Sequence, residues 1–205
     1  IAMQDLDIRG AGNLLGAEQS GFITDMGFET YQKILAEAME ELGVETGITT
    51  KSTAESFISD CTIETDQLAL IPDSYIDLTT EKIRIYKELD SLSSEKELVT
   101  MRNRLTDRFG KMPMELERLF DIVRIRQLGK KLGFEKIIIK NGVMIAFFIS
   151  NPLSQYYRSS RFSKVLENVN RNAKLFEVKQ PDGRLRIIVR NVDSIARAHE
   201  ILKML

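Results

Sequence analysis

Cysteine and histidine are almost absent from this chain, which has one of each, Cys61 and His199, among its 205 residues. A single cysteine excludes an internal disulfide framework. Together, the two residues exclude a Cys/His metal cluster and most Ser-His or Cys-His catalysis. We expect Cys61 to be a small, unreactive core residue. We expect His199 to lie at the surface or boundary of a late helix.

Long apolar runs are missing as well. No stretch approaches the roughly 18 residues that a membrane-spanning helix needs, and no signal peptide is recognisable. Hydrophobic residues make up 43% and charged residues 29% of the chain, an ordinary balance for a globular protein. We therefore expect a cytoplasmic protein with no membrane partner. Because the sequence begins at Ile1 without an initiator methionine, we also expect it to be a fragment of a longer protein.

Positive charge is scarce in the first half of the chain and negative charge is scarce in the second. Residues 1–101 contain 7 Lys+Arg against 20 Asp+Glu, and residues 102–205 contain 22 against 10, although the net charge is only −1. This polarity indicates either complementary packing of the two halves or two faces that meet different partners. Charges scattered over solvated surfaces are a third interpretation.

Glycine is concentrated in residues 5–21, DLDIRGAGNLLGAEQSG. Glycine at this density suits a loop with positive φ angles and close backbone approaches, not the interior of a helix or strand. The spacing of Gly10, Gly12 and Gly16 is one residue too long for the dinucleotide-binding fingerprint, and the Gly-Lys-Ser/Thr sequence of a P-loop is missing. The segment predicts an ordered functional loop whose outward-pointing polar side chains are Arg9, Asn13, Glu18 and Gln19.

Residues 1–43 are predicted to form one unit, made of this loop and an amphipathic helix over residues 25–42. Gly43 ends the helix, and its apolar face at helical spacing consists of Phe28, Tyr31, Ile34, Leu35, Ala38 and Leu42. Residues 44–60 are polar and rich in threonine. Such a composition predicts a linker and a domain boundary.

Residues 61–205 are predicted to form a second domain, which is helical over residues 61–133. A Ser94-x-x-Glu97 capping box begins one of its helices. The expected helices cover residues 80–91, 94–109 and 114–132, and the segment before them, residues 62–70, alternates only weakly and adds an extended stretch at most.

Residues 134–205 change to the period of strands and predict a ββαββα unit. Asn141-Gly142 is the turn of a first hairpin, and Pro181-Asp182-Gly183 that of a second. One helix is expected to begin at Asn151-Pro152, and another is expected to be capped by Asn191 or Asp193. The expected fold class is α+β, with a four-stranded, mostly antiparallel sheet and two helices on one of its faces.

The motif D-L-x-I-R-G-x-G-x-x-x-G-x-x-Q-S-G in residues 5–21 resembles the loop that follows the last helicase motifs in the transcription-repair coupling factor family and in the RecG translocase. Three further motifs resemble the C-terminal domain of the coupling factors, which RecG lacks. They are Ile71-Pro72-Asp73-x-Tyr75-Ile76, Ile85-Tyr86-Lys87 and Asp107-Arg108-Phe109-Gly110-x-x-Pro113. The second resemblance favours the coupling-factor family.

The resemblance implies a parent protein that is an ATP-driven translocase on double-stranded DNA. Such a protein displaces RNA polymerase stalled at a lesion and recruits the nucleotide-excision-repair protein UvrA. The family's translocation-coupling residues match Arg9 and Gln19, in the loop hinged by Gly10 and Gly12. Arginine suits a contact that changes partners between nucleotide states, and glutamine suits a switchable hydrogen bond.

The resemblance also implies what this chain lacks and what its second domain does. ATP and Mg²⁺ are expected to bind upstream in the parent protein, so we expect no cofactor, no catalytic residue and no independent enzyme here. The terminal domain of the family is regarded as autoinhibitory, because it packs against the UvrA-binding module and hides it until polymerase is engaged. Its expected partners are therefore that module and the upstream motor domains.

Two alternatives stay open from the residues themselves. The chain could be a freestanding nucleic-acid-binding module or a purely structural α+β unit. The features that favour nucleic acid are a basic helix face and an aromatic-basic cluster, which comprise Arg124, Arg126, Lys130 and Lys131, and Tyr156, Tyr157, Arg158 and Arg161. Packing of the aromatic rings against the sheet is an equal alternative.

Overall fold

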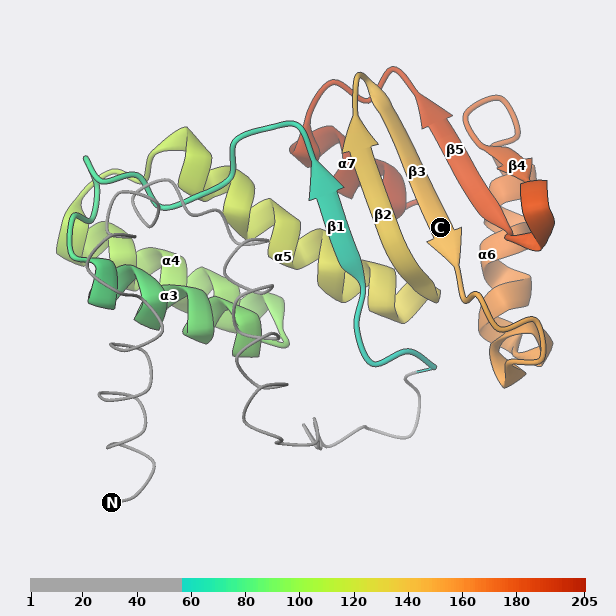
Figure 1. Cartoon of the computed structure of the whole chain (residues 1–205), viewed down its shortest axis with the longest axis horizontal. Helices are drawn as coiled ribbons and strands as arrows, with labels where there is room; N and C mark the ends of the chain where they lie inside the picture. Colours follow the sequence, from blue (N-terminus) through green and yellow to red (C-terminus); the bar gives the residue numbers. More distant parts are fainter. Residues whose placement is uncertain (1–56) are drawn as a thin grey trace.

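The computed structural model describes residues 57–205, and there the predicted α+β class is confirmed (Figure 1). The elements in chain order are β1 (Thr62–Thr65), α3 (Thr79–Ser91), α4 (Glu95–Phe109), α5 (Met114–Leu132), β2 (Phe134–Lys140), β3 (Val143–Phe148), η2 (Gln155–Arg158), α6 (Ser160–Arg171), β4 (Glu177–Lys179), η3 (Pro181–Gly183), β5 (Arg186–Arg190) and α7 (Ile195–Leu202).

The sheet has the order β1-β2-β3-β5-β4. Strands β2 and β3 form the predicted hairpin, in which Asn141 and Gly142 have φ of 53° and 72°. Two positive φ values are what a type I′ turn requires, and this turn matches the twist of the strands it joins. The second predicted hairpin is formed by β4 and β5, and both hairpins are antiparallel, as predicted. Strand β5 lies between β3 and β4.

The sheet of the described residues has five strands, not the four that were predicted. Residues Thr62–Thr65 lie parallel to β2, in register from Thr62 opposite Lys136 to Thr65 opposite Ile139. The strand is only four residues long and only Ile63 among them is buried, so its periodicity was too short to predict a strand. It attaches the start of the predicted helical part directly to the sheet.

Helix α5 is the centre of the core. It contacts α3 in the helical layer, and it contacts β1, β2, α6 and α7 on its other sides. Because two layers pack against it, its buried residues lie on more than one face of the helix. The buried residues of α5 are Leu116, Leu119, Phe120, Ile122, Val123, Ile125, Gly129 and Leu132. Figure 1 shows α5 and α7 behind the sheet and α3 and α4 beside it.

Helix boundaries follow local chemistry. Ser94 accepts a hydrogen bond from the Glu97 N–H, and the Glu97 carboxylate accepts one from the Ser94 N–H, so the predicted capping box is confirmed. Gly133 ends α5 with φ of 85°, a left-handed conformation that favours glycine. The Cβ of any other residue there would lie 2.2 Å from Tyr156 Cζ.

Two predicted helix starts were wrong. Helix α6 is capped by Ser159, after a short 3₁₀ turn, and not by Asn151-Pro152. The detour places Tyr156 in the core, where its hydroxyl donates to the Leu132 carbonyl. Helix α7 is capped by Ser194, which accepts from the Arg197 N–H, whereas Asn191 takes a left-handed φ of 58°.

The predicted unit of residues 1–43 and most of the predicted linker lie outside the described residues. The last part of the linker range is described, and there Ile58 is buried and Asp60 binds Arg126. The proposed boundary between residues 60 and 61 therefore stays a prediction.

Candidate functional site

The translocation-coupling residues predicted from the sequence, Arg9, Gly10, Gly12 and Gln19, lie outside the described residues. Their role stays a prediction. Within residues 57–205 lie two interaction features predicted from the sequence and one set of contacts between the family motifs.

The first feature is the basic face of α5. Arg126 binds both Asp60, at 2.6 and 2.8 Å, and Asp90. Arg124 binds Glu95 at 2.8 Å and Asp121 at 3.0 Å. The two guanidinium groups are mostly buried against these carboxylates. The hydrogen bonds to Arg124 hold the pKa of the Glu95 carboxyl below its ordinary value. The phosphate-binding interpretation is therefore wrong for Arg124 and Arg126.

The same pattern explains the charge polarity of the sequence. Acidic residues of the first half bind basic residues of the second half throughout the domain. The bridges between the halves are Glu95–Arg124, Asp60–Arg126, Asp90–Arg126, Glu81–Arg108, Glu88–Arg104, Glu64–Lys136 and Glu64–Lys140. Complementary packing of the two halves is thus supported.

The second feature is the aromatic-basic cluster around Tyr156. The Tyr156 ring is buried, lying 5.5 Å from Tyr157 and 5.3 Å from Phe162 between ring centroids. The Tyr157 hydroxyl donates to the Ile149 carbonyl, and burial raises the pKa of the Tyr157 phenol. These rings pack against the sheet and one another, so the base-stacking interpretation is wrong for Tyr156.

The third feature is a set of contacts between the motifs that carry the family resemblance. The Ile71 N–H donates to the Tyr86 hydroxyl at 3.0 Å. The Tyr75 hydroxyl donates to the Leu105 and Gly110 carbonyls, at 3.0 and 3.1 Å. We call these residues, with the pairs Asp73–Lys82 and Glu81–Arg108, the motif cluster. It joins the loop before α3 to α3 and to the end of α4, and its role is structural.

Sequence reasoning did not find this cluster as a unit. Its signal was nevertheless in the sequence, because two of the motifs contain a tyrosine next to apolar residues, and a buried phenol needs a hydrogen-bond partner. Burial raises the pKa of Tyr86 to about 12, so its hydroxyl stays protonated at neutral pH.

The two scarce residues behave largely as predicted. Cys61 is 1% exposed, and burial raises the pKa of its thiol to about 12. A thiol of that kind is unreactive near neutral pH. His199 is partly buried on α7, and burial lowers the pKa of its imidazole.

Within residues 57–205, no group of three or more His, Cys, Asp or Glu residues has the arrangement of a metal site. The helices described here include none that is both long and apolar enough to cross a membrane.

Comparison with known proteins gives a consistent result. Residues 65–159 match the family model of the TRCF domain. The chain is 38% identical to the transcription-repair-coupling factor of Staphylococcus epidermidis over 192 aligned residues. These residues cover 93% of this chain and 15% of that protein. It is 34% identical over 205 residues to the factor of Rickettsia conorii, covering 98% and 17%. It is 41% identical over 137 residues to that of Bacillus subtilis, covering 67% and 11%.

A solved structure, the C-terminal domain of transcription-repair coupling factor, has the same fold. It matches with a TM-score of 0.59 and 18% identity, covering 73% of this chain and 92% of that one. The chain spans less than one fifth of the length of the three full-length relatives. The similarity in sequence and fold shows that the chain belongs to the transcription-repair-coupling factor family.

Proposed function

We propose that this chain is part of an ATP-dependent DNA translocase that couples transcription to nucleotide excision repair. The parent protein would displace RNA polymerase stalled on double-stranded DNA and recruit UvrA, in the cytoplasm. The observation that carries the proposal is the similarity to transcription-repair-coupling factors along 93% of this chain. That similarity extends beyond the TRCF domain at residues 65–159.

Within that protein, residues 1–43 would convert ATP hydrolysis into stepping along DNA. Arg9 and Gln19 would exchange partners during the nucleotide cycle, and Gly10 and Gly12 would allow the loop to move. ATP and Mg²⁺ would be bound by upstream domains of the parent protein, as the resemblance to the coupling-factor family implies. This chain alone would not hydrolyse ATP.

Residues 61–205 would act as the regulatory domain. In the closed state the domain would mask the UvrA-binding module of the same protein, and engagement of polymerase would release it. Such a device needs only a modest difference in free energy between the closed and open states. The described domain is suited to move as one body, because α5 contacts both its helical layer and its sheet.

The coupling role is tested in the full-length parent protein by Arg9→Ala and Gln19→Ala. We expect loss of translocation on double-stranded DNA, measured by triplex displacement, with ATP hydrolysis largely retained. Asn13→Ala is the matched control, because position 13 lies in the same loop but is not one of the positions that carry the resemblance. Parallel loss of both activities, or of neither, would contradict the coupling role.

The regulatory role is tested by deleting residues 60–205 from the parent protein. We expect binding of UvrA to increase, measured by surface plasmon resonance with immobilised UvrA, because the binding module is no longer covered. Unchanged binding would remove the autoinhibition proposal and leave the coupling role intact.

A further inference from the structure

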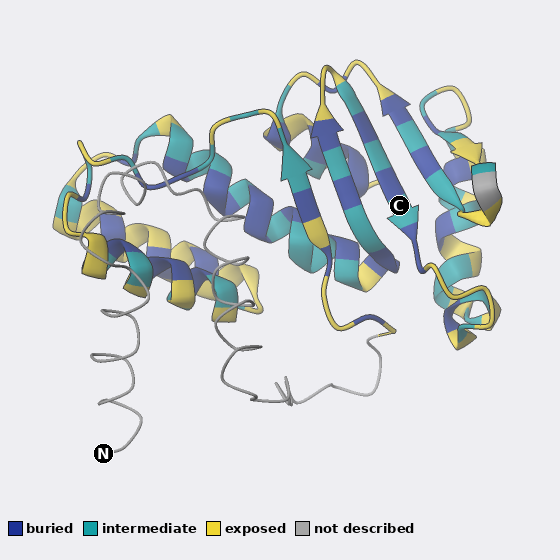
Figure 2. Ribbon diagram, viewed as in Figure 1, coloured by how far each residue is buried: buried dark blue, intermediate teal, exposed yellow. Residues whose placement is uncertain are grey.

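The sheet has one face that no helix or strand of the described residues covers. Helices α5 and α7 lie behind the sheet in Figure 1, and the open face is turned toward the viewer. Figure 2 shows buried and intermediate positions alternating along β2, β3 and β5, as expected for strands with one face in the core. The intermediate positions are the side chains of the open face.

Pairing of the strands arranges these side chains in rows. The central row crosses β2, β3 and β5 through Ile138, Ile145 and Ile188, which lie opposite one another in register. Glu64 on β1 and Glu177 on β4 end this row. The isoleucine row is therefore an apolar strip that crosses the middle of the open face.

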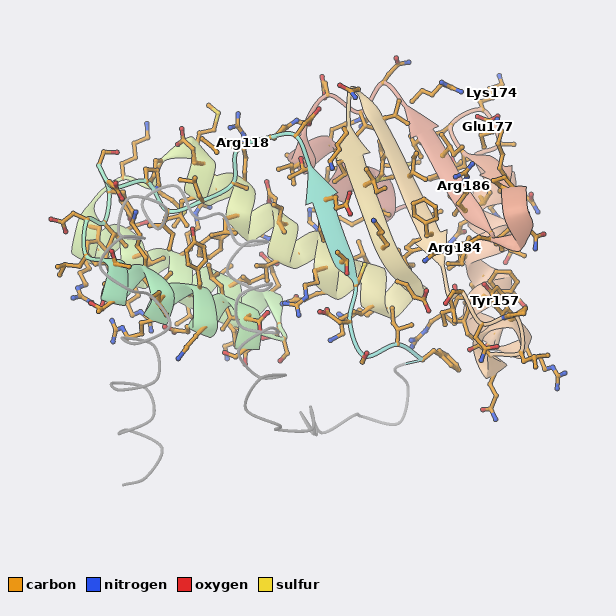
Figure 3. The ribbon with its side chains drawn as sticks, viewed as in Figure 1. Arg118, Tyr157, Lys174, Glu177, Arg184 and Arg186 are labelled. Carbon is orange, nitrogen blue, oxygen red and sulfur yellow. The ribbon has the colours of Figure 1, made fainter. Side chains whose placement is uncertain are left out.

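Cationic rows lie on both sides of the isoleucine row. On one side the register places Phe147 between Lys136 and Arg186. The Arg184 and Arg186 guanidinium groups lie over the Phe147 ring, at 5.1 and 5.8 Å from its centroid. On the other side Val143 lies between Lys140 and Arg190. Figure 3 labels Arg184, Arg186 and Glu177 at the β5 and β4 side of the sheet.

Carboxylates of the face are already occupied. Glu64 is bound by Lys136 at 2.5 Å and by Lys140 at 3.1 Å. Glu177 is bound by Lys179 at 2.8 Å and Arg190 at 3.6 Å. These bonds lower the pKa of both glutamates, so both stay anionic at neutral pH. Each of these two glutamates faces two cations, and Glu135 of β2 lies 3.5 Å from Arg184. The cations still outnumber the carboxylates, which leaves the face with an excess of positive charge.

Arg186 adds an independent observation. Its Nε is buried without a hydrogen-bond partner within the described part of the chain. A buried donor left unpaired costs free energy. An acceptor from a partner that displaces the neighbouring side chains and binds the Arg186 Nε–H would remove this cost and so gain binding free energy.

We propose that the open face is a docking site for an acidic amphipathic segment of a partner protein. Apolar side chains of the segment would pack on the isoleucine row, and Asp and Glu on both of its flanks would bind the cationic rows. Isoleucine has no aromatic face on which a base can stack, and the Phe147 ring in the flanking row is already covered by Arg184 and Arg186. The face therefore favours protein over nucleic acid. A second copy of this chain would bring the same surplus of cations against itself and is disfavoured.

The dimensions of the row set the size of the segment. Neighbouring strands lie about 4.8 Å apart, so the five strands from β1 to β4 place the ends of the row roughly 19 Å from each other. A helix rises about 1.5 Å per residue and would need about 13 residues to follow the row. The proposal concerns a surface of residues 57–205 and does not depend on the translocase function.

The test uses the full chain and a fluorescein-labelled peptide of 16 residues, with Leu at helical spacing on one face and Glu on both flanks. Binding is measured by fluorescence anisotropy and mapped by ¹H–¹⁵N NMR. We expect shifts on β2, β3 and β5, and a loss of affinity of roughly tenfold for each of Ile145→Thr and Arg186→Gln. The matched controls Val99→Thr and Arg197→Gln, at exposed positions on α4 and α7, should bind as the unchanged chain does.

Two further probes separate the alternatives. A peptide with Lys in place of every Glu should not bind, and oligo-dT should bind more weakly than the Glu peptide. Equal binding of the Lys peptide, no effect of Ile145→Thr in a variant that melts normally, or tighter binding of oligo-dT through Arg186 would each overturn the proposal. The last result would instead identify the face as a nucleic-acid interface.

Discussion

Gly129 lets α5 approach Cys61, the residue before β1, and Ile137 of β2. Gly129→Ala is therefore expected to destabilise the protein. A Cβ added at Gly129 would lie 2.6 Å from the Cys61 Sγ and 3.1 Å from the Ile137 Cδ1. Both neighbours are buried, at 1% and 0% exposed. Neither side chain can turn toward solvent, so the helix and the strand must move apart.

Two effects set the magnitude. Overpacking of a core costs typically about 1–3 kcal/mol, and replacing glycine by alanine inside a helix gains about 1 kcal/mol. The expected net loss of unfolding free energy for Gly129→Ala is therefore about 1 kcal/mol. Removing the Cys61 sulfur makes room for the new methyl group. In the background of Cys61→Ala, the substitution Gly129→Ala should then stabilise the helix instead of overpacking the core. The effects of the two substitutions on the free energy of unfolding should therefore be coupled by about 1–2 kcal/mol.

The cycle is measured by urea unfolding of the full chain, followed by far-UV circular dichroism. The reactivity of the Cys61 thiol toward DTNB provides a second measurement in the unchanged chain and in Gly129→Ala, which both keep the cysteine. Slow modification of the unchanged chain, and faster modification of Gly129→Ala, would show that the contact itself has loosened. Additive effects of the two substitutions, within about 0.5 kcal/mol, would refute the steric reasoning.

Three other variants follow from the same geometry. Gly133→Ala forces a methyl group into the buried Tyr156 ring at a φ of 85°, and a loss of more than about 3 kcal/mol is expected by urea unfolding; a loss below about 1 kcal/mol would contradict it. Tyr86→Phe leaves the buried Ile71 N–H without its acceptor and should cost about 1–3 kcal/mol in the same assay, so a neutral result would show that another acceptor takes over. Burial lowers the pKa of His199, so at pH values near an ordinary imidazole pKa of about 6.5 the unfolded chain binds more protons than the folded one. The free energy of unfolding should fall as the pH drops from about 7 through this value. An NMR titration of the single imidazole checks the direction, and His199→Gln should remove this part of the pH dependence.

Much of the fold could be predicted from the sequence because its signals are local. The Asn141-Gly142 turn, the Ser94 capping box and the glycines that end α4 and α5 act within a few residues. Strand β1 could not be predicted in the same way. It is four residues long, and its partner β2 begins more than seventy residues later, so its position depends on contacts that α5 brings about.

The candidate interfaces were harder to predict than the elements. The sequence shows Arg124 and Arg126 as part of a basic run on a helix, which suggests free cations. Their partners Glu95 and Asp60 come from segments 29 and 66 residues away, and only the tertiary fold brings them together. The open face had the opposite problem, because its isoleucine row draws one residue from each of three strands and appears in no single segment.

The two resemblances in this sequence report on different properties. The motifs at Ile71–Ile76, Ile85–Lys87 and residues 107–113 meet in the motif cluster, where tyrosine hydroxyls and ion pairs join α3 and α4. None of these contacts needs a ligand, so these motifs identify the family through its fold. In the proposed parent protein, a loss of repair activity in Tyr75→Phe should therefore follow the fraction of folded protein, and lowering the temperature should restore both. Only the loop at residues 5–21 is predicted to act in the motor cycle, and substitutions there should reduce activity without reducing the folded fraction.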